Sequence, residues 1–527
     1  MSDIRTCGAL LTERAKANPD DTFYVIDGVS FTYHEVDERS NKIAHSLNGL
    51  GISKGDRVCV LLRSSIDHIC AWFGTVKIGA IFVPINLQLQ EDQMAHIINN
   101  CETQFLMVEA DLLSQVEAMK AKIPGIRTVI VCGENVPASI PKWEIVPFEQ
   151  LYHGSSDPVD SEVTNADLAC LLYTSGTTGP PKGVMLSHEY YIAGGELLVD
   201  LMSETKNDVF YATLPLYHVM GQIHGVATAL QVGGKAVLVD RFSVTRFWED
   251  VGKYGITCIC ITGTQCNYLY QQPPKAGDAE NSLRVVMAFP MPGHIVGDFE
   301  KRFGLRMRSI YGLTEALLPI SSRYDQSYKV GSLGWATDYE VRVADDTDNE
   351  LPANEVGNIL VRPIATSRRV FDGYYKMPEA TVEMLKHCWF HTGDVGYKDE
   401  DGLIWFASRK KDVVRFRGEN VSAGQVENII NANSKVAECA VIGVPSDVGE
   451  EDIKVLVRLK GKQILKPEEL LAFCEEKMTW FMIPRYVEFV QDLPKTSTDK
   501  VEKFKLKDNW KNSNTWDREA ASYKLKR

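Results

Sequence analysis

LLYTSGTTGPPKGV, residues 171–184, places a short apolar run directly before a loop of small residues, hydroxyl side chains and one lysine. The apolar residues that lead to Tyr173 predict the end of a buried strand. The glycines and prolines that follow exclude a regular element. A loop rich in hydrogen-bond donors at the carboxyl end of a strand is where α/β sheets bind phosphate groups. The stretch therefore favours an α/β protein with a phosphate-binding loop.

This loop differs from the Walker P-loop. The Walker pattern, G-x-x-x-x-G-K-[ST], needs glycine before the lysine, and position 181 is proline. An ordinary surface turn is the alternative for a loop of this composition. Phosphate binding is favoured because four hydroxyl side chains precede a single lysine, namely Thr174, Ser175, Thr177 and Thr178 ahead of Lys182.

Length, charge and cysteine usage restrict the class of protein. The chain has 527 residues, 44% of them hydrophobic, which predicts two or more domains with full cores. A net charge of −13 argues against a nucleic-acid partner. The N-terminus resembles no signal peptide, and no apolar run approaches the ~18 residues of a membrane span. Twelve cysteines without C-x-x-C spacing indicate reduced thiols. We therefore expect a cytoplasmic protein without a transmembrane segment.

Residues 1–410 alternate short β-like runs with amphipathic stretches. The expected strands are 56–62, 127–132, 235–239, 256–261 and 283–289, and the expected helices are 91–100 and 243–254. This alternation predicts βαβ units, hence a large domain of mostly parallel sheet with helices on both faces.

The C-terminal part has a different pattern. From Gly357 the sequence predicts hairpin strands, with a turn at Asp401-Gly402. Beyond the charged linker SRKKD, residues 408–412, two helices and two strands predict a small α+β domain. The expected helices are 425–433 and 467–478, and the expected strands are 436–444 and 453–459. The predicted domains are therefore 1–410 and a mobile domain of 411–527.

A second motif, SIYGLTE, residues 309–315, combines a hydroxyl and a carboxylate on one short loop. The Thr314 hydroxyl suits phosphate oxygens, and the Glu315 carboxylate suits Mg²⁺, which takes few protein ligands. An ordinary polar loop is the alternative.

Two further motifs follow toward the C-terminus. HTGD, residues 391–394, presents Asp394 after a glycine turn, as in sites that bind a ribose diol. A turn-capping aspartate is the alternative. Arg409, at a predicted strand end, could hold a nucleotide sugar or phosphate. LPKTSTDKVEK displays Lys500 on a short loop, although lysine-rich tails are usually only solvated.

Taken in order, TSGTTGPPKG, YGLTE, TGD, the arginine of SRKKD and PKTSTDK resemble the acyl-adenylating superfamily of acyl-CoA synthetases, peptide-synthetase adenylation domains and beetle luciferases. The resemblance covers essentially the whole chain. It implies that the first loop holds the β- and γ-phosphates of ATP. The residues that would contact the triphosphate are Thr174, Ser175, Gly176, Thr177, Thr178, Gly179 and Lys182.

The resemblance also implies roles for the other ATP-site residues. Tyr311 would stack on adenine, and Thr314 would touch the α-phosphate. Glu315 would hold Mg²⁺. Asp394 and Arg409 would fix the ribose.

The remaining implied roles concern the acid, CoA and the domain movement. Lys500 would bridge the substrate carboxylate and the α-phosphate. Lys411 would be the hinge about which the small domain swings. Gly418 would lie beside the pantetheine of CoA. His218 and Gly221 would lie beside the acyl group, with a structural histidine as the alternative for His218.

The implied reaction explains these residue types. A carboxylate attacks the α-phosphorus of ATP, forms a mixed anhydride and releases pyrophosphate, and the CoA thiol then displaces AMP. Because two anions meet, a lysine and Mg²⁺ must neutralise the accumulating charge. No protein nucleophile is needed.

The chain departs from the family pattern at two places. Asp499 stands before Lys500, where the family usually has glycine, and its carboxylate could pair with the lysine. The stretch AFPMPGH, residues 288–294, replaces a glycine-rich segment and so changes the floor of the nucleotide and acyl pockets.

Within the superfamily, the chain is expected to be a free-standing acid–CoA ligase, since no carrier domain follows. Three stretches, 71–86, 418–422 and 426–447, look closest to the crotonobetaine/carnitine–CoA ligase branch. A medium- or long-chain fatty acid–CoA ligase of fatty acid metabolism is an alternative, as is a non-catalytic nucleotide-binding relic of the fold. The expected partners are a small carboxylic acid, ATP and CoA, and a homodimer is left open.

Overall fold

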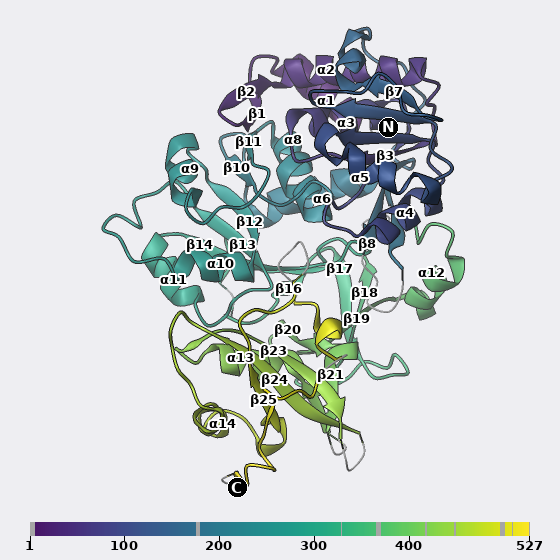
Figure 1. Ribbon diagram of the computed structural model, residues 1–527. Helices are drawn as coiled ribbons and strands as arrows, with labels where there is room; N and C mark the ends of the chain where they lie inside the picture. The colour runs from purple at the N-terminus through teal and green to yellow at the C-terminus, as the bar shows by residue number, and fades with distance from the viewer. Residues whose placement is uncertain are drawn as a thin grey trace. The chain divides into compact units, whose positions relative to one another are not determined.

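The computed structural model describes residues 6–174, 180–327, 329–364, 370–416, 419–446, 450–495, 501–507 and 510–525 (Figure 1). The chain forms two compact units. The first contains residues 1–329, 336–340 and 362–386, and the second contains 330–335, 341–361 and 387–527. This division differs from the predicted boundary between residues 410 and 411, which stays a prediction about where the chain pivots.

One large sheet has seven strands and carries the phosphate-loop motif. Its order is β7 (Glu144–Pro147), β6 (Thr128–Cys132), β5 (Phe105–Glu109), β3 (Arg57–Leu61), β4 (Ile81–Pro84), β8 (Leu168–Thr174) and β9 (Lys182–Ser187). Every neighbouring pair is parallel except β8 and β9, which run antiparallel on either side of the loop. The predicted mostly parallel sheet is confirmed.

The second large sheet has nine strands. Its order is β16 (Trp335–Ala336), β15 (Ile320–Ser321), β14 (Arg306–Tyr311), β13 (Val285–Phe289), β12 (Cys258–Thr262), β10 (Val209–Ala212), β11 (Lys235–Leu238), β1 (Thr22–Ile26) and β2 (Val29–Thr32). The strands from β14 to β1 are parallel. The five strands expected between residues 56 and 289 all form, each within two residues of its predicted bounds.

The helices that alternate with these strands are α1 (Cys7–Ala17), α2 (Tyr33–Gly49), α3 (Ile66–Lys77), α4 (Glu91–Asn100), α5 (Leu113–Ala118), α6 (His188–Met202), α7 (Val219–Gln222), α8 (Ala229–Val232), α9 (Phe247–Tyr254), α10 (Gly263–Tyr270), α11 (Val296–Phe303) and α12 (Pro378–Met384). A π-helix, η4 (Ile223–Thr228), joins α7 to α8. Helix α4 has its predicted bounds. Helix α9 begins four residues later than predicted, because residues 244–246 form a turn.

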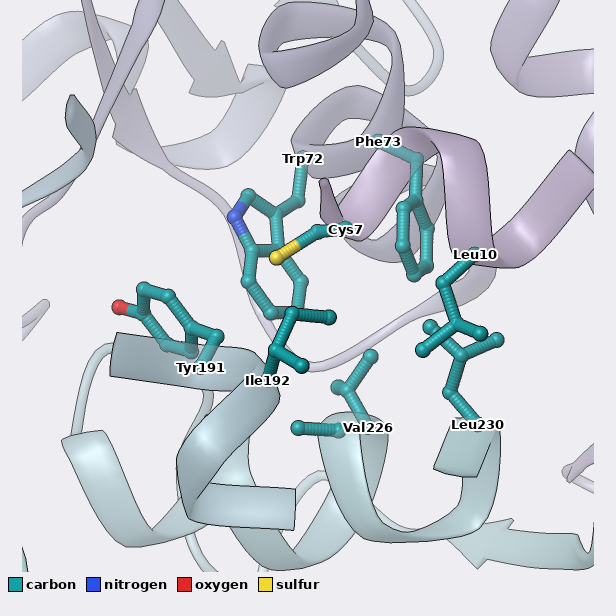
Figure 2. Close-up of a pocket in the computed structure, with 9 residues that line it drawn as sticks. Cys7, Leu10, Trp72, Phe73, Tyr191, Ile192, Val226 and Leu230 are labelled. Carbon is teal, nitrogen blue, oxygen red and sulfur yellow. The ribbon is translucent and has the colours of Figure 1, made fainter. Parts of the chain in front are cut away.

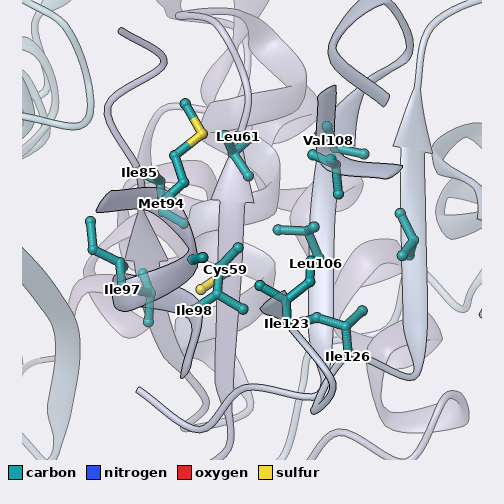
Figure 3. Close-up of a cluster of buried hydrophobic side chains, with 14 of the residues drawn as sticks. Cys59, Leu61, Ile85, Met94, Ile97, Ile98, Leu106, Val108, Ile123 and Ile126 are labelled. Carbon is teal, nitrogen blue, oxygen red and sulfur yellow. The ribbon is translucent and has the colours of Figure 1, made fainter. Parts of the chain in front are cut away.

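Burial of both faces of the parallel strands holds the seven-stranded sheet together. Four of the five residues of β3 are buried, which requires cover on each side. Figure 3 shows one side, where Leu61, Leu106 and Val108 from the strands meet Met94 and Ile98 from α4. Each such side chain contributes about 1.5–3 kcal/mol when fully buried. Helix α4 is therefore fixed to the sheet.

Most of the remaining elements belong to the second unit. A four-stranded sheet has the order β17 (Tyr339–Ala344), β18 (Gly357–Pro363), β19 (Phe390–Lys398), β20 (Ile404–Arg409), and a two-stranded sheet pairs β21 (Val413–Phe416) with β22 (Glu419–Ser422). A second four-stranded sheet has the order β23 (Val436–Pro445), β24 (Glu451–Leu459), β25 (Tyr486–Phe489), β26 (Trp516–Asp517). The helices are α13 (Ala423–Asn431), α14 (Pro467–Glu475) and α15 (Lys503–Lys507). The expected smaller α+β region is confirmed.

Two further expectations concern the membrane and the cysteines. Within the described ranges, no helix has both the length and the apolarity that crossing a bilayer requires. All twelve cysteines lie in these ranges as free thiols, and eleven of them are buried. The prediction of reduced thiols agrees with this arrangement.

Candidate active site

The base of the phosphate loop is held from two sides. Thr174 and Lys182 are opposite partners at the ends of β8 and β9, so the loop begins and ends at one point. The Tyr173 hydroxyl donates to Asn100 Oδ1 of α4 at 2.7 Å. His96 Nε2, also on α4, lies 3.1 Å from the Pro181 carbonyl oxygen. Both strand ends are therefore tied to the same helix.

A second chain segment, residues 371–375, lies against β9. The Met185 amide donates to the Gly373 carbonyl at 3.0 Å, and the Asp372 amide donates to the Met185 carbonyl at 2.9 Å. The Tyr375 amide donates to the Gly183 carbonyl at 2.8 Å. These bonds extend the edge of the sheet and place Tyr374 beside the strand that begins with Lys182.

Tyr374 connects the phosphate-loop strand with the YGLTE loop. Its hydroxyl donates to Glu315 Oε1 at 2.8 Å. The ammonium of Lys182 lies 4.9 Å from the centre of its ring, a cation–π distance. The Phe371 amide also donates to the Glu315 carbonyl at 3.0 Å. Two motifs more than a hundred residues apart in the sequence therefore meet at one tyrosine.

The Glu315 carboxyl is buried. Burial raises its pKa, because a charged carboxylate loses solvation there. The hydrogen bond from Tyr374 and the charge of Lys182 act in the opposite direction and lower that pKa. The site therefore holds a carboxylate whose ionised form depends on its two neighbours.

The loop that carries Glu315 is tightly constrained. It follows Tyr311, the last residue of β14. A side chain at Gly312 would place its Cβ 2.7 Å from the Leu318 amide nitrogen, so only glycine fits there. The Thr314 carbonyl accepts a hydrogen bond of 3.0 Å from the buried hydroxyl of Tyr190. Thr314 and Glu315 thus have a fixed backbone.

These residues fit a magnesium ion held mainly by its substrate. The described ranges contain no group of three or more histidine, cysteine or acidic side chains that could hold a metal by themselves. Mg²⁺ is commonly bound through one or two carboxylates plus water and substrate phosphates. A single buried carboxylate that shares Tyr374 with Lys182, at one end of the predicted phosphate loop, meets that requirement.

The predicted acyl-side residues lie on another rigid turn of the first unit. His218 caps α7, and its Nδ1 accepts from the Met220 amide at 3.3 Å. A Cβ at Gly221 would lie 2.1 Å from the Pro215 carbonyl oxygen, which excludes any side chain. Gln222 Nε2 donates to the Leu216 carbonyl at 2.8 Å. Backbone contacts therefore fix the position of His218. This is compatible with a place beside the acyl group and also with a purely structural role.

Asp394 and Arg409, the predicted ribose residues, face each other across β19 and β20 in the second unit. Arg409 Nε lies 3.8 Å from Asp394 Oδ1. The expected glycine turn at HTGD is wrong, because these residues form an irregular part of β19, where Gly393 has φ +74°. The Thr392 hydroxyl stabilises it by accepting from the Asp394 amide at 3.1 Å and donating to the Ile359 carbonyl at 2.7 Å.

Several predicted residues lie outside the described ranges: Ser175, Gly176, Thr177, Thr178, Gly179, Gly418 and Lys500. Lys411 lies in a short 3₁₀ helix, Lys410–Asp412. Described residues on either side of Lys500 form ion pairs. Lys495 pairs with Glu438 at 2.8 Å, and Lys503 pairs with Glu427 at 2.7 Å.

Figure 2 shows a cavity of about 10 Å³ elsewhere in the first unit. Its lining is apolar and includes Trp72, Phe73, Tyr191, Ile192, Val226 and Leu230. A cavity of this volume has room for about one water molecule, and an apolar lining offers such a molecule few partners. It contains none of the predicted site residues and is a packing defect rather than a substrate site.

Tyr374 is the site residue that the sequence analysis missed. FDGYYKMP contains two adjacent tyrosines, and neither the spacing nor the composition indicates which of them faces a carboxylate. The signal is the backbone pairing of residues 371–375 with β9, which depends on the folded structure.

Most of the chain matches known proteins. Residues 11–375 match the AMP-binding enzyme family, and residues 425–500 match the AMP-binding enzyme C-terminal domain. The chain is 32% identical to the crotonobetaine/carnitine–CoA ligase of Salmonella agona (strain SL483), over 90% of this chain and 93% of that protein. It is 33% identical to the corresponding ligase of Escherichia fergusonii, with the same coverage.

Solved structures similar to this chain include proteins of the same kind. The anthranilate CoA ligase AuaEII in complex with anthranoyl-AMP has a TM-score of 0.88 at 26% identity, covering 96% of this chain and 97% of that one. ATP-bound MatB from Rhodopseudomonas palustris has a TM-score of 0.86 at 27% identity, covering 96% and 99%. The chain belongs to the AMP-binding enzyme family and is an AMP-forming acyl-CoA synthetase. ATP and CoA are the co-substrates of that class.

Proposed function

We propose that this enzyme activates a crotonobetaine- or carnitine-type acid as its acyl-AMP and then transfers the acyl group to CoA. In the first half-reaction the acid's carboxylate attacks the α-phosphorus of ATP and pyrophosphate leaves. In the second, the CoA thiol attacks the acyl carbonyl and AMP leaves. The catalytic part of this proposal rests on one observation: Lys182 and Glu315 both contact the side chain of Tyr374.

In the first half-reaction, the residues of the first unit bind and neutralise the triphosphate. Thr174 and Lys182, together with Ser175–Gly179 of the loop, contact the β- and γ-phosphates. Thr314 contacts the α-phosphate. Glu315 holds a magnesium ion that, when bound, neutralises the charge that develops on the departing pyrophosphate. Fixed charges of this kind stabilise a transition state without reorganising during the reaction.

The nucleoside and the acid need further contacts. Tyr311 stacks on the adenine, and Asp394 and Arg409 bind the ribose. Lys500 bridges the acid's carboxylate and the α-phosphate during adenylation. The segment 411–527 then pivots at Lys411, which withdraws Lys500 and brings Gly418 to the pantetheine of CoA. His218 and Gly221 border the acyl group.

The relatives support the choice of acid. The curated proteins with 32–33% identity are named for crotonobetaine and carnitine, and the alignment extends over 90% of this chain. An acid of this kind carries a quaternary ammonium, which proteins commonly bind on an aromatic face or next to a carboxylate.

A panel of carboxylic acids tests this proposal. Pyrophosphate release is measured for crotonobetaine, carnitine, medium- and long-chain fatty acids and benzoate, each with and without CoA. The expected result is release with the betaines and thioester formation only with CoA. Preference for a fatty acid would overturn the substrate. Absence of pyrophosphate with every acid would overturn the proposed activity.

A further inference from the structure

Tyr374 presents two chemically different surfaces to two charged groups of opposite sign. Its hydroxyl donates a hydrogen bond of 2.8 Å to Glu315 Oε1. Its ring face receives the Lys182 ammonium at 4.9 Å from the ring centre. Within the described ranges no ion pair joins Lys182 to Glu315 directly, and both groups contact the same tyrosine.

The position of Tyr374 is fixed by its backbone rather than by these two contacts. Its amide donates to the Thr381 hydroxyl at 2.9 Å, and it forms a β-bridge with Val184. The neighbouring amide of Tyr375 is bonded to the Gly183 carbonyl. The side chain therefore projects from an anchored segment, so it can orient the groups that it touches.

The separation of the two charges has a chemical consequence. A direct pair between the carboxylate and the ammonium would satisfy each with the other, and the phosphates would have to break that pair before binding. A tyrosine leaves both groups available, because a hydroxyl engages one carboxylate oxygen and a ring face attracts an ammonium without accepting its protons.

From this geometry we propose that Tyr374 is a positioning residue for adenylation: it orients the Glu315 carboxylate toward its metal and keeps the Lys182 ammonium apart from that carboxylate and directed to the phosphates. This inference rests on the proposed function, since it takes Glu315 as the metal-binding carboxylate and Lys182 as a phosphate-binding cation. It adds to that function a residue that contacts both charged groups and orients them.

Two substitutions test the hydroxyl and the ring face of Tyr374 individually. Tyr374→Phe keeps the ring and removes the hydroxyl. We expect the Mg²⁺ concentration that gives half-maximal pyrophosphate release to rise about tenfold, the loss expected for one hydrogen bond to a charged group. The KM for ATP at saturating Mg²⁺ should rise by a similar factor, because Glu315 holds the metal only together with the nucleotide. Tyr374→Leu removes the ring as well, so the KM for ATP should rise further.

The neighbouring tyrosine provides a matched control. The Tyr375 hydroxyl lies 3.5 Å from Glu102 Oε2 in an exposed contact. Tyr375→Phe removes the same atom one residue away, and both kinetic constants should stay at their wild-type values. Thermal unfolding of each variant verifies that the fold is intact.

A binding experiment provides a readout without turnover. Calorimetry with a non-hydrolysable ATP analogue is carried out with Mg²⁺ and with EDTA. For Tyr374→Phe, affinity should fall about tenfold with Mg²⁺ and remain unchanged with EDTA. Equal losses under both conditions, or no loss under either, would overturn the positioning role.

Glu315→Gln distinguishes failure of this inference from failure of the proposed function. If Glu315→Gln needs a higher Mg²⁺ concentration for half-maximal pyrophosphate release while Tyr374→Phe behaves as wild type, Tyr374 has no positioning role and the proposed site stands. If the wild-type enzyme releases no pyrophosphate with any acid, the proposed activity fails, and the calorimetric comparison still tests Tyr374.

Discussion

At the scale of the residue, the sequence predicts the charged groups of the site but not what they touch. YGLTE indicates a carboxylate near a phosphate, because hydroxyl and carboxylate occur on one loop. Its hydrogen-bond donor is 59 residues further along the chain, on a segment whose position is set by pairing with β9. Local spacing carries no information about such a contact.

Glu315→Gln tests the carboxylate itself. The amide keeps the size and much of the hydrogen bonding but removes the charge, so nucleotide affinity without metal should change little. Adenylation should fall by about 10²-fold at low Mg²⁺, because a charge-stabilising group is lost at the transition state. Added Mg²⁺ should restore part of the rate of pyrophosphate release. Wild-type adenylation at low Mg²⁺ would show that Glu315 has no part in the reaction.

Lys500→Ala separates the two half-reactions. The lysine is proposed to contact the α-phosphate and the acid only during adenylation, so formation of acyl-AMP should fall by about 10³-fold. Thioester formation from supplied acyl-AMP and CoA should stay within about twofold of wild type, because an interaction made only in the first transition state does not stabilise the second. The two rates are measured separately. Equal losses in both steps would contradict the assignment.

At the scale of the element, periodicity and turn residues predict which segments become strands or helices, but not irregularities. Helix α4 has its predicted bounds because EDQMAHIINN combines a clear apolar face with acids in its first turn. The glycine of HTGD predicts a turn. In the structure Gly393 instead allows an irregular strand, since the partner strand and the Thr392 hydroxyl supply the hydrogen bonds. Partners distant in sequence decide that outcome.

The π-helix η4 contains a buried histidine that should make the protein sensitive to acid. Burial lowers the pKa of His224 from 6.5 to about 3, and its Nε2 has no hydrogen-bond partner within the described ranges. Between pH 6.5 and 3 the unfolded chain binds a proton at this position and the folded chain does not. Stability therefore decreases as pH falls through this window.

His224→Leu should reduce that decrease. The free energy of unfolding should fall less steeply with pH below 6.5, by about 1.4 kcal/mol per pH unit for one proton. His68 and His188, whose pKa values burial lowers to about 4, retain their share of the slope. Denaturant unfolding at pH 5, 6, 7 and 8 measures it. The difference between variant and wild type should be constant between pH 7 and 8, and an unchanged slope below 6.5 would contradict the prediction.

At the scale of the whole molecule, the change in composition after residue 410 indicates a second region but not its full extent. The second unit also includes 330–335, 341–361 and 387–410, which precede the end of the charged linker. Sequence patterns divide a chain at one point, whereas compact units form from contacts, and a chain can enter the same unit more than once. The predicted boundary is therefore better tested as a pivot than as the edge of a compact unit.

Lys411→Pro tests that pivot. Lys411 lies in the 3₁₀ helix Lys410–Asp412, whose usual φ of about −50 to −70° proline can adopt, while the ring prevents rotation about that bond. If the segment 411–527 must turn between the half-reactions, pyrophosphate release in a single turnover should remain within about twofold of wild type, and CoA thioester formation should fall by about tenfold or more. Lys410→Pro, which fixes the neighbouring φ, is the matched control and should affect thioester formation less. Normal thioester turnover in Lys411→Pro would show that the chain does not pivot there, and the predicted boundary at 411 would have to be abandoned.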